Sequence, residues 1–516
     1  MNGAQSLVRT LVANGVDVCF ANPGTSEMHF VAALDQVSGM RCVPGLFEGV
    51  VTGAADGYYR MAGKPAATLL HLGPGLGNGL ANLHNAKKAH SGIVNIVGQH
   101  ATHHIRHDAP LTADIEGVAR PMSDWVLTSS TAARLAGDAA LAIEQARAAP
   151  GRVATLIAPA DTAWGEAAGP AHAAPPAPRR QANHDAIVAG ARALAHGAAA
   201  MLMLGGAALR GKALEHAGRI AAKTGCRLMA EYNNARMECG AGRVRVDRLP
   251  YAVDNALTAT RGVRQLVLVG AKTPVSFFAY PGKPSLLIPQ DCAVTTVATV
   301  AEDVEHALAA IAAELGAQDA KPAHVSERHE GELPQGRITA DGVAALLATL
   351  MPENAVVCDE SVSTGRTFGA RMAHAAPHDW LSIMGGSIGW ALPAATGAAI
   401  GAPDRKVIAL EGDGSAMYTL QALWTMAREN LDVTVVLLAN RSYQILRGEL
   451  RNVGAGEPGR NATDMLTLDR PELDWCALAH GHGVEAGQAT TLEELAHELR
   501  RAYGRRGPYL VEAVIA

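Results

Sequence analysis

The sequence predicts an α/β fold made of three doubly wound, parallel-sheet domains. Stretches with helical periodicity alternate with short apolar runs that end in glycine, as expected when crossover helices join buried parallel strands. Two segments rich in proline, alanine and charge, 169–183 and 316–336, interrupt this alternation and are typical of linkers. The expected domains therefore cover residues 1–168, 184–315 and 337–516.

Length and composition favour small-molecule chemistry. A chain of 516 residues suffices for about three domains, and 48% hydrophobic residues can fill several cores. With 18% charged residues, a net charge of −5 and an isoelectric point near 6.5, neither nucleic acid nor an anionic membrane is expected as a partner. Seven cysteines without C-x-x-C spacing, no signal peptide and no run of ~18 apolar residues indicate a cytoplasmic protein.

The predicted strands show where functional residues should lie, because ligands of parallel α/β sheets bind at the carboxyl ends of the strands. In chain order, the apolar runs are VDVCFANPG, AATLLHLGPG, GIVNIVGQ, AAAMLMLGG, QLVLVGA, VIALEGDG and VTVVLLAN.

The outer two domains repeat one pattern. Thr52-Gly-Ala-Ala55 leads through a helix and a basic turn into the strand AATLLHL and a glycine loop, and Thr396-Gly-Ala-Ala399 leads in the same way into VIALEGDG. The short motif alone is a common start of a small-residue helix. The matching order of helix, turn, strand and glycine loop indicates one architecture used twice.

The C-terminal copy carries a candidate metal site. Asp413 and Asn440 end two predicted strands that are joined by one helix. If these strands are neighbours, a carboxylate and an amide oxygen lie side by side, and such hard oxygen donors suit Mg²⁺ that holds a diphosphate. Gly412 and Gly414 let the backbone approach phosphates, and the helix after Ser415 contributes its dipole. A plain Asp-Gly turn and a strand-ending Asn are the alternative.

The segment GDGSAMYTLQALWTMARENLDVTVVLLAN resembles the signature of thiamine diphosphate enzymes. The resemblance implies that Asp413, Asn440 and the backbone carbonyl of Ser442 bind the metal. The chain has Ala439 where that family often has a first Asn. The resemblance also implies a pyrimidine-binding N-terminal domain, a central domain and a diphosphate-binding C-terminal domain.

The N-terminal copy holds one carboxylate, Glu48, among apolar residues at a strand-to-helix junction. An unpaired carboxylate is costly to bury. The resemblance implies that Glu48 hydrogen-bonds N1′ of the aminopyrimidine, a role that a raised pKa would suit. The alternative is an exposed carboxylate at a helix start.

Further motifs resemble cofactor-binding segments of the same family. FANPGTSE resembles the first glycine turn on the substrate side, DESVSTGRTF the stretch that contacts the diphosphate, and MGGSIGWALP the loop beneath the bent cofactor. In that loop the resemblance makes Ile388 the apolar wedge and the Gly386 carbonyl the partner of N4′. The cofactor-binding residues that it implies are Asn22, Pro23, Gly24, Thr25, Asn78, Ser363, Gly386, Ile388, Gly412, Gly414, Ser415 and Tyr443.

Within the family the chain is most similar to acetolactate synthase large subunits and benzoylformate decarboxylases. His71 matches an active-site histidine of the decarboxylases and would be an acid/base, although a strand-ending histidine is often structural. The turn GPGLGN is closer to acetolactate synthases. Phe277 stands where the decarboxylases have a second histidine, and Leu446 stands where pyruvate decarboxylases have a glutamate, which argues against a pyruvate decarboxylase site.

The resemblance implies a thiamine diphosphate- and Mg²⁺-dependent carboligase that acts on small 2-oxo acids. A benzoylformate-type decarboxylase is the alternative, and a non-catalytic homologue a third possibility. FAD is compatible with the central domain but is not favoured. The family arrangement further implies a dimer or tetramer in which Glu48 and Asp413 of one active site come from different chains.

Overall fold

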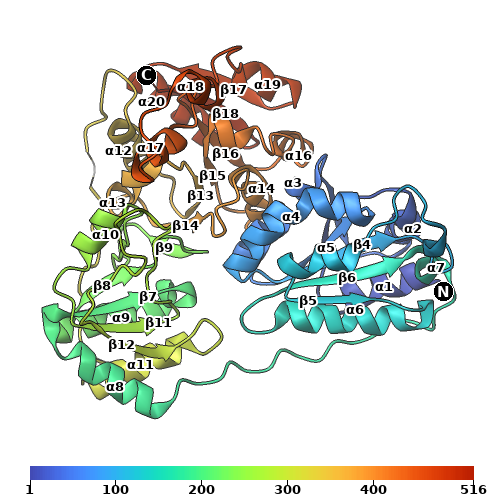
Figure 1. Ribbon diagram of the computed structural model, residues 1–516, viewed down its shortest axis with the longest axis horizontal. Helices are drawn as coiled ribbons and strands as arrows, with labels where there is room; N and C mark the ends of the chain where they lie inside the picture. Colours follow the sequence, from blue (N-terminus) through green and yellow to red (C-terminus); the bar gives the residue numbers. More distant parts are fainter. Residues whose placement is uncertain (330, 516) are drawn as a thin grey trace.

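The computed structural model describes residues 1–329 and 331–515 and contains three sheets covered by helices (Figure 1). The strand orders are β2-β1-β3-β4-β6-β5, β10-β8-β7-β11-β12 and β17-β18-β16-β15-β13-β14-β9. Among the named strands of the described residues, every pairing is parallel except that of β9 (Met237–Cys239) with β14 (His378–Ser382). The predicted α/β class with parallel sheets is therefore confirmed, with one antiparallel edge strand that the sequence did not indicate.

The remaining strands alternate with helices in chain order. The strands are β1 (Val18–Asn22), β2 (Arg41–Pro44), β3 (Ala66–Leu70), β4 (Ile93–Gln99), β5 (Trp125–Thr128), β6 (Val153–Pro159), β7 (Ala200–Leu204), β8 (Arg227–Ala230), β10 (Asp247–Arg248), β11 (Gln265–Val269), β12 (Ala293–Ala298), β13 (Ala355–Glu360), β15 (Val407–Gly412), β16 (Val433–Ala439), β17 (Glu485–Ala489) and β18 (Tyr509–Val514).

The helices include several of only four to seven residues. They are α1 (Gly3–Ala13), α2 (Met28–Gln36), α3 (Glu48–Ala62), α4 (Leu72–Ala89), α5 (Ile115–Ala119), α6 (Ala132–Arg147), α7 (Ala160–Trp164), α8 (His184–Leu194), α9 (Gly211–Thr224), α10 (Val253–Ala259), α11 (Val304–Glu314), α12 (Ala340–Leu350), α13 (Phe368–Met372), α14 (Ala391–Gly401), α15 (Asp413–Ala416), α16 (Ala422–Arg428), α17 (Gln444–Asn452), α18 (Arg460–Leu466), α19 (Trp475–Gly481) and α20 (Leu492–Tyr503).

The first and third sheets have the same topology. When β13 to β18 are matched in chain order to β1 to β6, the order β14-β13-β15-β16-β18-β17 repeats β2-β1-β3-β4-β6-β5. Each sheet winds outward in both directions from its first and third strands, and ligands of such sheets bind at this switch point. The repeated architecture predicted for the outer domains is confirmed.

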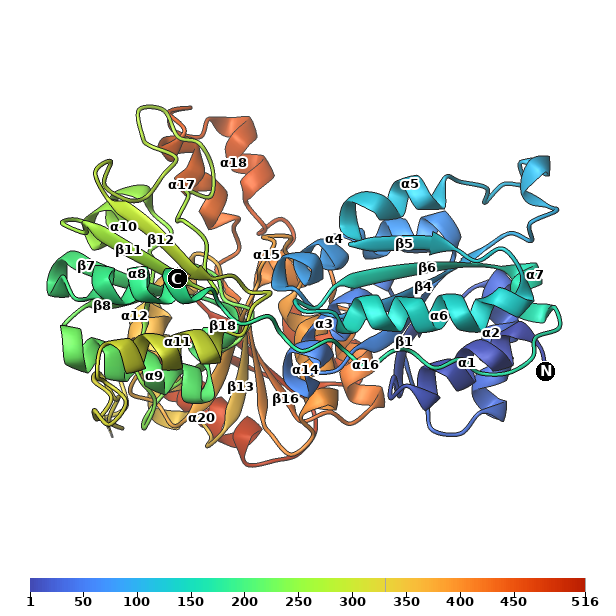
Figure 2. The ribbon, with the colours of Figure 1, turned by 90° about the horizontal axis from the view of Figure 1, so that it is seen from below.

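The two copies pack against each other through equivalent helices, α3 and α14, which lie side by side between the first and third sheets (Figure 2). These helices carry the two TGAA motifs. Added Cβ atoms at Gly57 and Gly397 would lie 2.0 and 1.8 Å from the carbonyl oxygens of Ala394 and Ala54. Glycine is therefore required where the two backbones touch, and one buried core extends across both copies.

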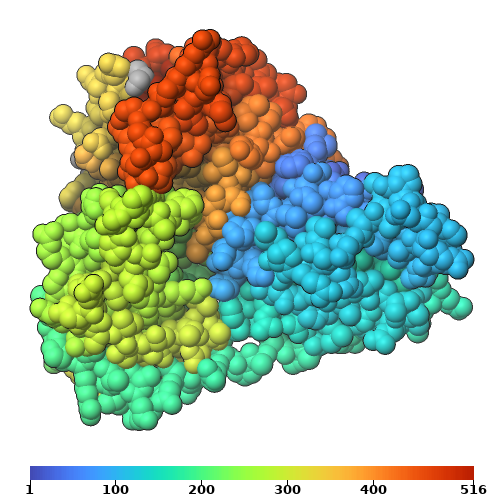
Figure 3. Space-filling model, viewed as in Figure 1, coloured from blue at the N-terminus to red at the C-terminus, as the bar shows by residue number. Residues whose placement is uncertain are grey.

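The middle sheet lies beside the C-terminal sheet, and the two share a second core. The proline-rich segment 169–183 runs as an extended thread from the N-terminal unit to α8 (Figure 1). On the face seen in the space-filling view, the N-terminal, middle and C-terminal parts meet at the centre (Figure 3). The domain bounds remain a prediction, because β9 lies within 184–315 and yet pairs with the third sheet. No helix in the described part of the chain is long and apolar enough to cross a bilayer.

Candidate active site

The predicted metal ligands lie at the ends of two neighbouring strands. β15 pairs with β16, so that Asp413 and Asn440 follow adjacent strand ends. Asp413 is 4% exposed, and its two oxygens accept hydrogen bonds from the backbone N–H groups of Gly414 (2.9 Å) and Arg441 (2.6 Å). The Asn440 side-chain oxygen accepts from the N–H of Ser442 at 3.0 Å. Burial raises the pKa of the Asp413 carboxyl, and a bound cation would favour its charged form.

Strained backbone accompanies the predicted site residues. Three residues adjacent to predicted site residues have positive φ angles, which residues other than glycine rarely adopt: Leu72 (47°), Val362 (43°) and Arg441 (53°). They follow His71, precede Ser363 and separate Asn440 from Ser442, respectively. Five other non-glycine residues of the described chain also have positive φ angles, so this strain agrees with the predicted site without identifying it.

Glu48 begins α3 and is 8% exposed. Its Oε2 accepts a hydrogen bond from the Asn78 side-chain amide at 2.9 Å. Asn78 lies within α4, so the expectation of a glycine turn over 73–78 was wrong. Helix α4 begins immediately after His71 and includes Pro74, which a first helical turn tolerates because its missing N–H would be unpaired there anyway.

His71 is held by a carboxylate that the sequence analysis missed. Glu27 Oε2 lies 2.8 Å from His71 Nδ1 and also accepts from the backbone N–H of Gly24 at 2.7 Å. The Glu27 side chain is 2% exposed, whereas the imidazole is 22% exposed. Because a carboxylate can only accept, Nδ1 carries the proton and Nε2 is left to exchange one. Glu27 is the last residue of the FANPGTSE motif, and its place in that motif was the sequence signal that could have indicated it.

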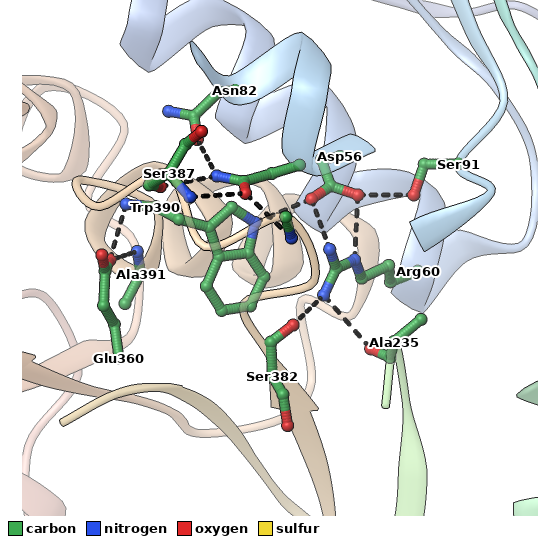
Figure 4. Close-up of polar contacts among 12 residues, drawn as sticks. Asp56, Arg60, Asn82, Ser91, Ala235, Glu360, Ser382, Ser387, Trp390 and Ala391 are labelled. Atoms are coloured by element: carbon green, nitrogen blue, oxygen red, sulfur yellow. Dashed lines mark hydrogen bonds and ion pairs between the residues drawn. The ribbon is translucent and has the colours of Figure 1, made fainter. Parts of the chain in front are cut away.

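The segment between β14 and α14 contains Gly386, at φ 73°, and Ile388. Its C-terminal end is held by Glu360, whose carboxylate accepts from the backbone N–H groups of Gly389, Trp390 and Ala391 at 2.6–2.7 Å (Figure 4). Glu360 is fully buried at the end of β13, so three donors converge on one buried carboxylate at the start of α14.

A second buried carboxylate faces Glu360. Glu411 is its register partner on β15 and accepts from the Ser415 hydroxyl and the N–H of Gly412. Burial raises the pKa of Glu360 to about 7, and burial with repulsion from Glu360 raises that of Glu411. Glu411 lies two residues before Asp413. Glu411 stood in an apolar strand pattern, so the sequence pattern did not suggest it.

A buried ion pair joins α3 to the start of α14 (Figure 4). Arg60 donates to both oxygens of Asp56 at 2.9 and 2.6 Å, and the indole N–H of Trp390 donates to Asp56 at 2.7 Å. The same arginine donates to the backbone carbonyls of Ser382 and Ala235 at 2.7 and 3.3 Å. One network therefore joins all three parts of the chain.

The other predicted residues form two groups. The first group begins at the end of β1 and consists of Asn22, Pro23, Gly24 and Thr25. Gly24 packs closely on the His71 ring, because a Cβ added to Gly24 would lie 2.4 Å from that ring. In the C-terminal group, a Cβ at Gly414 would lie 2.5 Å from the Tyr443 ring, and the Gly412 carbonyl accepts from Ser415. Within the described chain no hydrogen bond joins Glu48 or His71 to Asp413 or Asn440.

Two family models match the chain. Residues 1–118 match the thiamine pyrophosphate enzyme N-terminal TPP binding domain, and residues 364–513 match the C-terminal TPP binding domain. A Mycobacterium tuberculosis protein named as an acetolactate synthase large subunit, IlvX, is 50% identical over 100% of this chain and 99% of its own length.

The chain belongs to the thiamine pyrophosphate enzyme family.

Other members of this thiamine diphosphate family are similar over their whole length. The benzoylformate decarboxylase of Pseudomonas aeruginosa is 30% identical, with 97% of this chain and 96% of the relative covered. The solved thiamine diphosphate-dependent 4-hydroxybenzoylformate decarboxylase of Rhodococcus jostii RHA1 superposes with a TM-score of 0.86 at 25% identity, covering 100% and 99% of the two chains.

The residues present fit the cofactor and its metal. The two side-chain oxygens after β15 and β16 are the hard donors that Mg²⁺ prefers. Gly414 leaves room for the Tyr443 ring beside the loop that follows β15, and Glu48 presents a buried carboxylate with only one oxygen bonded in the described structure. The structure thus offers both ends of a thiamine diphosphate site.

Proposed function

We propose that this protein is a thiamine diphosphate- and Mg²⁺-dependent enzyme that decarboxylates a 2-oxo acid and protonates the remaining fragment, releasing an aldehyde. The observation that carries the proposal is the His71–Glu27 pair, since a carboxylate on Nδ1 stabilises the imidazolium form, which can deliver a proton from Nε2. When bound, the cofactor supplies the carbanion that attacks the 2-oxo group and the electron sink that lets CO₂ leave.

The chain's own residues would divide the remaining work. Asp413, Asn440 and the carbonyl of Ser442 would hold Mg²⁺ and through it the diphosphate, which Ser363, Ser415 and Tyr443 would help to bind. Glu48 would share a proton with N1′ of the aminopyrimidine, and its position in the helix start keeps it out of bulk water. Asn22, Pro23, Gly24 and Thr25 would line the substrate side, and Ile388 would support the cofactor from below.

Carboligation, which the resemblance in sequence implied as the leading activity, is the second candidate here. The 50%-identical relative named as an acetolactate synthase large subunit favours it. In that case a second 2-oxo acid, rather than a proton from His71, would accept the fragment.

A panel of 2-oxo acids tests the proposal. Protein saturated with thiamine diphosphate and Mg²⁺ should release CO₂ and an aldehyde, and chromatography separates aldehydes from condensation products. Glu48→Gln should abolish turnover while keeping the stabilisation by cofactor and metal, because glutamine cannot share the proton. Retained turnover in this variant, or no thermal shift of the unaltered protein with cofactor and Mg²⁺, would refute the assignment. Predominant condensation products would favour the second candidate.

A further inference from the structure

Helix α4 presents a row of three asparagines at positions 78, 82 and 85, a spacing that places them on one face. Asn78 donates to the Glu48 carboxylate at 2.9 Å. Asn82 donates to the carbonyls of Gly49 (2.8 Å) and Gly389 (3.1 Å). The row therefore begins at the proposed catalytic carboxylate and continues to the segment between β14 and α14.

Asn85 forms hydrogen bonds with the segment between β14 and α14 on both sides of Gly386. Its oxygen accepts from the N–H groups of Gly385 (3.1 Å) and Ser387 (3.3 Å), and its amide donates to the Ser387 carbonyl at 2.7 Å. The same amide donates to the Asn82 oxygen at 2.9 Å, so the two side chains orient each other. Asn82 and Ser387, which both bond Asn85, are labelled in Figure 4.

The segment needs this support because its backbone forms neither helix nor strand over 383–390. Asn82 is 2% exposed and Asn85 is fully buried, so neither water nor a sheet neighbour would replace the lost partners. Added Cβ atoms would lie 2.5 Å from His84 at Gly385 and 2.8 Å from Phe277 at Gly386. The loop thus lies against His84 of α4 on one side and Phe277 of the middle part on the other.

We propose that Asn82 and Asn85 are positioning residues, which set the direction of the Gly386 carbonyl and hold it in fixed relation to the helix that carries the partner of Glu48. The inference rests on the proposed function, in which this carbonyl receives N4′ of the aminopyrimidine. Neither asparagine touches the reacting atoms. They act through the backbone of Gly385, Ser387 and Gly389, and no motif of the sequence had indicated them.

Backbone amide exchange in the cofactor-free protein directly tests whether the hydrogen bonds of Asn85 hold this segment. Asn85→Ala removes the acceptor of two N–H groups, so deuterium uptake of peptides covering 383–391 should accelerate about tenfold or more. Asn95→Ala is the matched control. Asn95 is a fully buried amide of the same domain that bonds only Thr68 and Thr155, and its loss should leave this peptide unchanged. Equal uptake in both variants would overturn the proposal.

Kinetics with saturating thiamine diphosphate and Mg²⁺ test the catalytic consequence. In Asn85→Ala, kcat should fall roughly tenfold to a hundredfold while KM for the 2-oxo acid changes less than about twofold, because a displaced carbonyl affects the reaction more than substrate binding. Asn95→Ala should lower Tm to a similar extent with kcat retained. Faster exchange with full kcat in Asn85→Ala would show a merely structural role. No turnover in the unaltered protein would refute the proposed function, and the exchange result would still decide whether the asparagines hold the loop.

Discussion

At the scale of single residues, the arrangement around His71 is decided by a side chain 44 positions away. Glu27 fixes the imidazole through Nδ1, and Gly24 leaves room for the ring. A histidine at the end of a strand often has only a structural role. Its pairing with a buried carboxylate favours a proton on Nδ1 and stabilises the imidazolium form, which can donate a proton from Nε2.

Glu27→Gln should lower kcat roughly a hundredfold, because an amide can donate to Nδ1 and so favours the wrong tautomer. Steady-state kinetics of Glu27→Gln, His71→Ala and the double variant check this. The double variant should be no slower than His71→Ala, since the two residues act as one unit. Losses that multiply would contradict the pairing.

The Glu360–Glu411 pair should make stability pH-dependent. Burial raises the pKa of Glu360 from an ordinary value of 4.5 to about 7, so the folded protein binds more protons than the unfolded chain between those values. The free energy of unfolding should therefore fall as pH rises through this interval. Glu360→Gln should flatten this fall in urea titrations of the cofactor-free protein at pH 5, 6 and 7, because it removes the titrating carboxyl group. Exposed Glu314→Gln should not, and identical slopes in all three proteins would contradict the interpretation.

At the scale of elements, the two copies meet through glycine. Gly57 and Gly397 allow α3 and α14 to touch backbone to backbone, and the two TGAA motifs lie within these helices at the contact, where Gly397 meets the Ala54 carbonyl. The same two helices begin at Glu48 and next to the Gly386 segment. Their crossing therefore sets the relation between the two cofactor-facing loops of one chain.

Gly57→Ala should destabilise the protein by about 3 kcal/mol or more, since its methyl group would lie 2.0 Å from a carbonyl oxygen and one backbone must move. Chemical unfolding measures this. Gly137→Ala in α6 is the control, because nothing lies within 4 Å of its Cβ position and alanine favours a helix by up to about 1 kcal/mol. Equal stability of the two variants would refute the tight crossing.

At the scale of the whole molecule, the Asp56–Arg60 pair joins parts of the chain that are far apart in sequence. It receives the Trp390 indole from the C-terminal part, and Arg60 reaches the carbonyl of Ala235 in the middle part. Both side chains are almost fully buried, at 0% and 2% exposure. Their removal should therefore loosen the contact between all three parts.

Arg60→Met should cost about 3–5 kcal/mol, because it leaves Asp56 charged and buried without its cation. Arg120→Met is a matched control. Arg120 forms an ion pair of the same i,i+4 spacing with Glu116, but this pair is solvent-exposed and should contribute about 0–1 kcal/mol. Thermal and urea unfolding compare the two. A small effect of Arg60→Met would show that the network does not hold the parts together.

The sequence by itself determined the α/β class, the repeated outer architecture and the positions of Asp413 and Asn440 at two strand ends, because strand periodicity, glycines at strand ends and short spacings are local properties of a chain. Only the tertiary structure revealed β9 in the third sheet, Glu27 beside His71, and Asn85 beside Gly385, 300 positions apart. The helix over 73–78 also escaped prediction, since glycines and a proline suggest a turn until packing is known. Hydrogen bonds between segments that are far apart in the chain produce no periodic pattern in the sequence. Burial in the folded structure decides which polar residues become partners.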